Sequence, residues 1–310
     1  MTWALAILGL AILLVAGDFL VKGAVNLALR LGLPPLIVGL TIVAFGTSAP
    51  ELLISIDAVL ADAPGIALGN VIGSNTANVL LVLGVPALIF GLETRGTGTA
   101  KNYVVMLAAT ALFIALAFTG TFGPWASLVL LGALALVLAD QFREGWNTRV
   151  SEQEVEGADP HMRWWKIACF LLVGLVGLPI GAHVLIVNAK AIAESMGVPD
   201  AVIGLTMVAI GTSLPELATT VAAAAKRQAD VALGNVLGSN MFNLLAIIGI
   251  AGLVGDIPVA DSFLRVDLWV MLAASLVLAP FVLTSLAMNR IVGAVFCAAY
   301  GGYLWVVVAS

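Results

Sequence analysis

The chain has 310 residues, of which 62% are hydrophobic and only 10% charged, and its formal net charge at pH 7 is −5. A mean hydropathy of +1.13 excludes an ordinary soluble domain. The 13 lysine and arginine residues are scattered along the chain and form no patch that would bind nucleic acid. The composition therefore predicts a polytopic membrane protein.

Ten apolar stretches are predicted to cross a hydrocarbon core about 30 Å thick. They fall at residues 3–29, 36–60, 66–92, 103–119, 124–142, 166–189, 200–225, 231–254, 265–287 and 291–309. No basic residue precedes the first stretch, so we interpret it as a span and not as a signal peptide. The runs are too long and continuous for a β-barrel. We therefore predict an all-α polytopic membrane protein with about ten transmembrane helices.

The only long hydrophilic stretch, at 143–163, divides these spans into two groups of five. The predicted organisation is a first five-helix repeat at 1–142, a cytoplasmic linker at 143–165 and a second five-helix repeat at 166–310. With the N-terminus outside, ten lysines and arginines lie in inner loops and flanks and two in outer loops, with Lys22 near the inner end of the first span. This distribution predicts a cell (plasma or inner) membrane protein with both termini outside.

The two groups are related by an internal repeat. Residues 32–84 align without a gap with residues 197–249, at an offset of 165, and 25 of the 53 positions are identical. The shared segments include GTSAPEL with GTSLPEL and GNVIGSNTAN with GNVLGSNMFN. Because each half has an odd number of predicted spans, the second copy enters the membrane from the opposite side. Such inverted pairs are typical of transporters with a site near the bilayer midplane.

Each copy of the first segment places a glutamate, Glu51 or Glu216, inside an apolar helix. A charge at bilayer depth costs about 3 kcal/mol or more, so both should face a bundle interior or a wet cavity. Pro50 and Pro215 directly precede them and leave the carbonyl four residues earlier without its helical donor. We expect the helices to break there and to direct carbonyl oxygens into the cavity.

Neutral oxygens accompany the glutamates. Thr47 and Ser48 lie four and three residues before Glu51, so at least one hydroxyl shares its helix face, and Thr212 and Ser213 repeat the arrangement. Carboxylates, hydroxyls and carbonyls without histidine or thiolate suit hard cations such as calcium and sodium.

The second segment adds hydroxyl and amide oxygens at helical spacing. Ser74 and Asn78 are four residues apart, as are Ser239 and Asn243. Glycine pairs spaced by four residues in the same segments permit close helix approach. We expect these helices to pack directly against the broken ones.

Both repeats resemble the alpha-repeats of the sodium/calcium exchanger branch of the cation/calcium antiporter superfamily, in a short prokaryotic form. The resemblance covers nearly the whole chain and implies two inverted five-helix repeats. It implies that Glu51 and Glu216 are the central calcium ligands, shared with sodium, with backbone oxygens of Thr47 and Thr212 beside them. Further sodium ligands would be the carbonyls of Ala44 and Ala209 and the hydroxyls of Ser48, Ser213, Ser74 and Ser239. The amides of Asn78 and Asn243 would lie between the glutamates.

Two features separate this chain from other branches. Some sodium/calcium members carry aspartate at the second copy of the central position, where this chain has Asn243, so stoichiometry and potassium dependence stay open. Members of the calcium/proton branch have a motif similar to GNxxE at the position where this chain has GTSxPE, twice. The Thr-Ser pair of this motif favours sodium as the driving ion. The short linker predicts that there is no calcium-sensing domain.

The predicted function is secondary antiport by alternating access, with calcium export driven by sodium entry. Calcium/proton antiport through the same two glutamates is the alternative, and a passive channel is a further one. An enzyme is not expected, because the chain has neither HExxH nor GxSxG and its two glutamates are equivalent. Beyond the lipid bilayer and the transported calcium and sodium ions, no cofactor and no protein partner are expected.

One charged pair lies outside this set. Asp18 and Lys22 are four residues apart in the first span, and we interpret them as a structural ion pair with Lys22 reaching the inner interface.

Overall fold

The computed structural model describes residues 2–33, 35–94, 99–147, 159, 162–196, 211–284 and 286–309, and these are mostly helical. The first half contains α1 (Thr2–Leu31), α2 (Pro35–Val38), η1 (Gly39–Val43), α3 (Ala44–Thr47), α4 (Ala49–Leu60), α5 (Pro64–Ala77), η2 (Asn78–Val82), α6 (Gly84–Phe90), α7 (Ala100–Ala117), β1 (Thr121–Phe122) and α8 (Pro124–Asn147). The second contains α9 (Trp164–Ser195), α11 (Leu214–Ala225), α12 (Ala229–Phe242), η3 (Asn243–Ile247), α13 (Ile248–Val254), β2 (Ile257–Pro258), η4 (Phe263–Asp267), α14 (Leu268–Val277), α15 (Ala279–Leu283) and α16 (Arg290–Ala309). The four η elements are single turns of π-helix.

Seven helices of the described chain are long and apolar enough to cross a membrane, or eight if the bent pair Leu36–Thr47 and Ala49–Leu60 forms one span. The predicted span at 200–225 is described only from Gly211 onward. The last predicted span corresponds to a shorter apolar helix, Arg290–Val306. The chain is therefore a multi-pass helical membrane protein. Helix α8 continues past the predicted end at 142 as far as Asn147.

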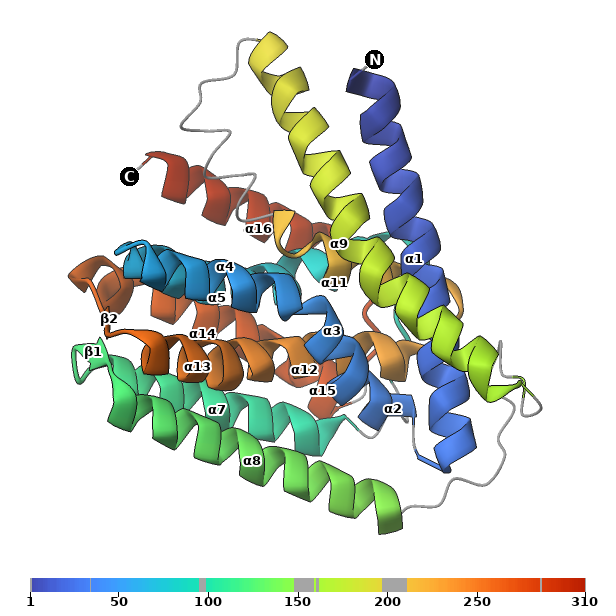
Figure 1. Cartoon of the computed structure of the whole chain (residues 1–310), viewed down its shortest axis with the longest axis horizontal. Helices are drawn as coiled ribbons and strands as arrows, with labels where there is room; N and C mark the ends of the chain where they lie inside the picture. The colour runs from blue at the N-terminus through green and yellow to red at the C-terminus, as the bar shows by residue number, and fades with distance from the viewer. Residues whose placement is uncertain are drawn as a thin grey trace.

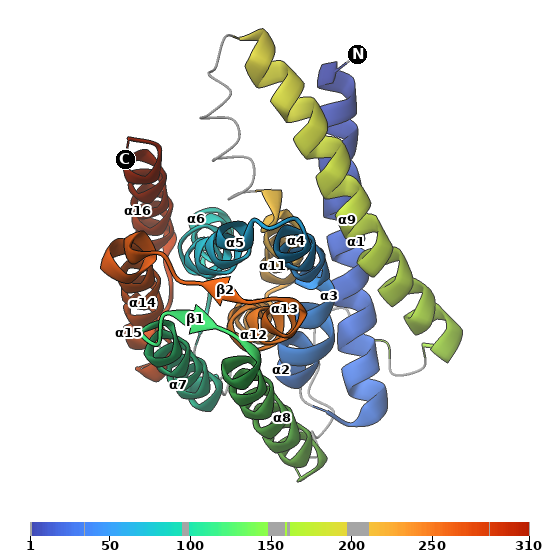
Figure 2. The same ribbon diagram turned by 60° about the vertical axis from the view of Figure 1, so that its left-hand side comes forward.

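The helices form a central group with three flanks (Figures 1 and 2). In Figure 2 the helices α4, α5, α6, α11, α12 and α13 are seen nearly end-on at the centre. The α7 and α8 helices cover one flank, α14 and α16 another, and the paired α1 and α9 cross the group steeply on a third. Burial follows this arrangement. In an apolar stretch of 18 residues, 89% of the residues are buried in Ala229–Val254, but only 22% are buried in Pro124–Arg143. The polar repeat segments are thus the most enclosed part of the molecule.

Glycines permit the closest helix contacts. A Cβ on Gly238 in α12 would lie 2.6 Å from the Leu40 carbonyl oxygen, so α12 packs directly on η1 and α3. This confirms, for the second copy, the expected packing of the glycine-containing helix against a broken one. Helices α1 and α9 approach equally closely, since a Cβ on Gly181 would lie 2.8 Å from the Leu13 backbone nitrogen.

The contact between α1 and α9 yields a stability prediction. Gly181→Ala should lower the free energy of unfolding by about 1–3 kcal/mol, because its Cβ overpacks a backbone-to-backbone contact. The matched control is Gly132→Ala in α8, where a Cβ would meet nothing within 4 Å. That control should leave stability unchanged or raise it by up to about 1 kcal/mol, from helix propensity. Thermal unfolding of the purified variants in one detergent measures both, and equal midpoints would contradict the close packing.

Candidate functional site

The site is built around one broken helix and the equivalent segment of the second copy, which is described from Gly211 onward. Residues Leu36–Thr47 and Ala49–Leu60 are bent by 42° at Ser48, which has φ −86° and ψ 2°. Helix α4 begins directly after it with Pro50 in its first turn. In the second copy, Ser213 has φ −86° and ψ 5° and precedes α11, with Pro215 in the first turn. The predicted break at the proline is therefore confirmed in α4 and recurs at the start of α11.

Each break places a glutamate in the first turn of the helix that follows it. Glu51 of α4 and Glu216 of α11 are both 1% exposed. The free backbone N–H groups of a helix N-terminus carry partial positive charge, which stabilises a carboxylate at this position. The N-termini of α4 and α11 thus lower the cost of an ionised carboxylate at each of these positions.

Hydroxyl groups connect the two repeats around these carboxylates. The Ser48 hydroxyl donates to Glu216 Oε1 at 3.3 Å. The Thr47 and Ser239 hydroxyls lie 3.4 Å apart, and the hydroxyls of their repeat counterparts, Thr212 and Ser74, lie 3.2 Å apart. Six of the predicted ligands therefore meet between the repeats.

Two asparagines orient the amides predicted to lie between the glutamates. Asn78 opens the π-helix η2 and donates from Nδ2 to Asn240 Oδ1 at 3.1 Å. Asn243 opens η3 and donates from Nδ2 to Asn75 Oδ1 at 3.0 Å. The Nδ2 groups of Asn75 and Asn240 also donate across the repeat boundary to each other's backbone oxygens, at 3.3 and 3.4 Å. The Nδ2 atoms of Asn78 and Asn243 thus each donate to the opposite repeat. The Oδ1 atom of each of these two amides therefore points away from that contact.

The described residues leave several buried oxygens of this cluster without a hydrogen-bond partner. These atoms are Glu51 Oε2, Glu216 Oε2, Asn78 Oδ1, Asn243 Oδ1 and Ser213 Oγ. A buried acceptor with no donor is costly unless a ligand satisfies it. Carboxylate, amide and hydroxyl oxygens are the ligands that calcium and sodium prefer, so the donor set fits the predicted cations.

The two alanines predicted as carbonyl ligands give different outcomes. Ala44 is fully buried in α3, and its carbonyl oxygen accepts hydrogen bonds from the Ser48 amide at 3.0 Å and from the Thr47 hydroxyl at 3.2 Å. The predicted ligand Ala209 lies outside the described residues.

Besides Asn75 and Asn240, a further pair of asparagines at the site, Asn70 and Asn235, was not predicted from the sequence. Asn70 donates to the Glu51 carbonyl at 3.2 Å and to the Ser55 hydroxyl at 3.1 Å. Its counterpart Asn235 donates to the Glu216 carbonyl at 3.4 Å and to two threonine hydroxyls on α11. These bonds fix the depth of each glutamate helix against its neighbour. The signal was present, because both asparagines are identical in the two repeats at the offset of 165.

The Asp18–Lys22 pair is confirmed, with Nζ and Oδ2 2.8 Å apart. A third member was missed: Lys226, at the end of α11, lies 2.6 Å from Asp18 Oδ1 and also donates to the Asp18 backbone oxygen at 3.2 Å. The three charged residues therefore connect α1 to the end of α11, and they are not part of the oxygen cluster.

Comparisons with known proteins show what the chain is similar to. The model of the family described as "Sodium/calcium exchanger protein" matches residues 1–143 and 166–309. The chain is 36% identical over 335 residues to the sodium/calcium exchanger MaX1 of Methanosarcina acetivorans, covering 96% of each. It is 34% identical over 290 residues to the inner membrane protein YrbG of Escherichia coli, covering 89% of this chain and 87% of that protein. A solved structure of the sodium-calcium exchanger NCX_Mj is similar with a TM-score of 0.83 at 31% identity, covering 100% of this chain and 98% of that one.

The asparagine cluster yields a prediction about Asn75, the residue that orients the predicted ligand Asn243. Asn75→Ala removes the acceptor that holds the Asn243 amide, so calcium affinity should fall about 10- to 100-fold, as for other partners that orient a metal ligand. Calorimetric titration of the purified protein measures the affinity and the number of bound ions, which should stay unchanged.

The matched control for Asn75→Ala is Thr76→Val. The Thr76 hydroxyl is buried in the same helix, and among the described residues it donates only to the Ile72 carbonyl, at 3.0 Å. Calcium affinity should be unaffected by this change. An Asn75→Ala affinity equal to that of Thr76→Val would contradict the orienting role.

Proposed function

The chain belongs to the sodium/calcium exchanger family, and from this premise we propose that it couples sodium entry to calcium export through the cluster around Glu51 and Glu216. Members of this family are membrane transporters and not enzymes, and they exchange sodium and calcium ions without a cofactor. The direction of transport and the residues that carry it are the new elements of the proposal.

One observation carries the proposal: two carboxylates, each 1% exposed, share a buried cluster with amide and hydroxyl oxygens that lack donors among the described residues. Two ionised glutamates bring a charge of −2, which one calcium ion neutralises. Without a cation the pair is costly at this depth, because its Coulomb repulsion adds to the desolvation of each group. Occupancy by calcium or by sodium therefore permits a closed state that the empty site resists.

The proposed ligand set is the one that the resemblance to the exchanger repeats implies. Glu51 and Glu216 hold calcium and are shared with sodium, and Asn78 and Asn243 contribute amide oxygens between them. The remaining proposed ligands are backbone oxygens of Thr47, Thr212, Ala44 and Ala209, and hydroxyls of Ser48, Ser213, Ser74 and Ser239. Since calcium and sodium share the glutamates, they compete for one site, and this competition couples their transport.

The proposed architecture has ten spans in two inverted five-helix repeats, 1–142 and 166–310, joined by the linker 143–165. Its support is the sequence offset of 165 and the paired contacts of equivalent residues at the site. We place both termini outside an inner membrane, on the distribution of lysine and arginine. The similar YrbG is named an inner membrane protein.

The coupling ion decides between sodium/calcium and calcium/proton antiport. Calcium uptake into proteoliposomes should require internal sodium when external sodium is absent, and an imposed proton gradient at symmetric sodium should not replace it. Uptake driven only by protons would establish the alternative. If three sodium ions move per calcium, one net charge crosses in each cycle, so membrane potential should contribute about 2.3 kcal/mol per 100 mV.

The shared glutamates yield a second transport prediction. Glu51→Gln and Glu216→Gln should each lower sodium-driven calcium uptake about 100-fold or more, because one of two buried charges facing the cation is lost at nearly constant shape. Asp57→Asn is the matched control, since Asp57 is an exposed carboxylate on the same helix α4, and it should retain uptake. Full activity of either glutamine variant would falsify the shared site.

A further inference from the structure

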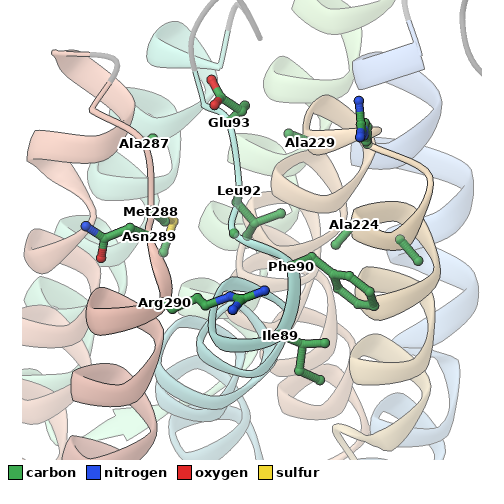
Figure 3. Close-up of a pocket in the computed structure, with 13 residues that line it drawn as sticks. Ile89, Phe90, Leu92, Glu93, Ala224, Ala229, Ala287, Met288, Asn289 and Arg290 are labelled. Carbon is green, nitrogen blue, oxygen red and sulfur yellow. The ribbon is translucent and has the colours of Figure 1, made fainter.

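A cavity of about 650 Å³ lies away from the oxygen cluster around Glu51 and Glu216, at the ends of α6 and α11 and the start of α16 (Figure 3). Its wall combines the apolar side chains of Ile89, Phe90 and Leu92 with the charged side chains of Glu93, Arg227 and Arg290. Both Ile89 and Phe90 are 47% exposed, at the end of a membrane helix. The cavity is therefore apolar on one side and charged on the other.

Backbone pairing holds the cavity wall in place. Leu92 and Met288 exchange two backbone hydrogen bonds of 2.9 Å each, which joins the chain after α6 to the chain before α16. The Thr94 hydroxyl donates to the Phe281 and Leu286 carbonyls, both at 2.8 Å. Asn289 accepts from the Val292 amide at 3.0 Å and so caps α16. The two segments that line the cavity, after α6 and before α16, are thus held in place by the protein's own hydrogen bonds.

The charge of the cavity is net positive. Arg227 and Arg290 are exposed, and neither has an ion pair with any residue of the described chain. Glu93 is the single carboxylate of the lining, and Figure 3 shows it toward the opposite end of the cavity from Arg290. A guanidinium group presents a fork of N–H donors that fits a pair of phosphate oxygens, and two such groups line this one cavity.

The backbone at Arg227 adds an independent observation. Arg227 follows the end of α11 with φ +55°, and the next residue, Gln228, donates back to the Ala223 carbonyl at 2.9 Å. Glycine is the favoured residue at this left-handed position after a helix, because a side chain there is strained. The repeat counterpart Asp62 has the same φ of +55° but the opposite charge. The strained position thus carries a basic side chain at one end of the molecule only.

We propose that this cavity binds the headgroup of an anionic phospholipid. Arg227 and Arg290 receive the phosphate, and an acyl chain lies against Ile89 and Phe90. Charge complementarity selects the anionic headgroup, and basic pockets between membrane helices are suited to such lipids. The exposed apolar side chains beside the arginines select a lipid over a free phosphate ion.

The test titrates the full-length purified protein, in a neutral detergent, with short-chain phosphatidylglycerol. Phosphatidylcholine of the same acyl length and inorganic phosphate are the comparison ligands, and native mass spectrometry measures the bound fraction. Phosphatidylglycerol should bind more tightly than either. Arg290→Gln and Arg227→Gly should each weaken it about fivefold, the effect expected for one basic residue near an anionic headgroup.

Asp62→Gly is the matched control for Arg227→Gly, because it makes the same backbone change at the equivalent turn of the other repeat. It should leave phosphatidylglycerol affinity unchanged, and both glycine variants should fold, since glycine favours the conformation already present. Equal affinity for phosphatidylglycerol and phosphatidylcholine would overturn the proposal, as would unchanged phosphatidylglycerol affinity in both arginine variants. Inorganic phosphate binding as tightly as the lipid would overturn the lipid as the occupant.

Discussion

The cost of burying two carboxylates among apolar helices constrains the rest of this structure. Glu51 and Glu216 are each 1% exposed, and no arginine or lysine contacts either of them among the described hydrogen bonds and ion pairs. Stabilisation comes instead from dipoles: the N-termini of α4 and α11 and the Ser48 hydroxyl. Dipoles lower the cost of burial without cancelling the charge, so the remaining charge stays available to a cation. A basic partner would neutralise the pair permanently.

The site belongs to neither repeat alone. The asparagine contacts run between the halves, from Asn78 to Asn240 and from Asn243 to Asn75. The hydroxyl contacts of Thr47 and Thr212 also cross that boundary. A shift of one half against the other would therefore change the directions of these side chains together. This explains why such polar residues occupy the most buried helices, where their hydrogen bonds hold the halves in register.

The sequence was sufficient to predict several of the residues that meet in this cluster, but not how their side chains are oriented. The two glutamates, the prolines that break their helices and the hydroxyls beside them are local features that duplication made visible. The π-helical turns that begin at Asn78 and Asn243 have no comparable signal, because a change of helix type depends on packing in three dimensions. Lys226 was missed for a related reason: its partner Asp18 lies 208 positions away along the chain. Local spacing predicted the pair on one helix and could not predict the third group on another.

Symmetry at the centre contrasts with asymmetry at the ends. At the site, two hydroxyl contacts are repeated by equivalent residues, Ser74 with Thr212 and Ser239 with Thr47. At the helix ends the turn after α11 carries Lys226 and Arg227, whereas the equivalent turn after α4 carries Ala61 and Asp62. Both turns adopt the same backbone conformation, so the fold does not require this difference in charge. The two halves are therefore alike where these polar side chains pack together, and they differ where a turn side chain is exposed, as Asp62 and Arg227 are.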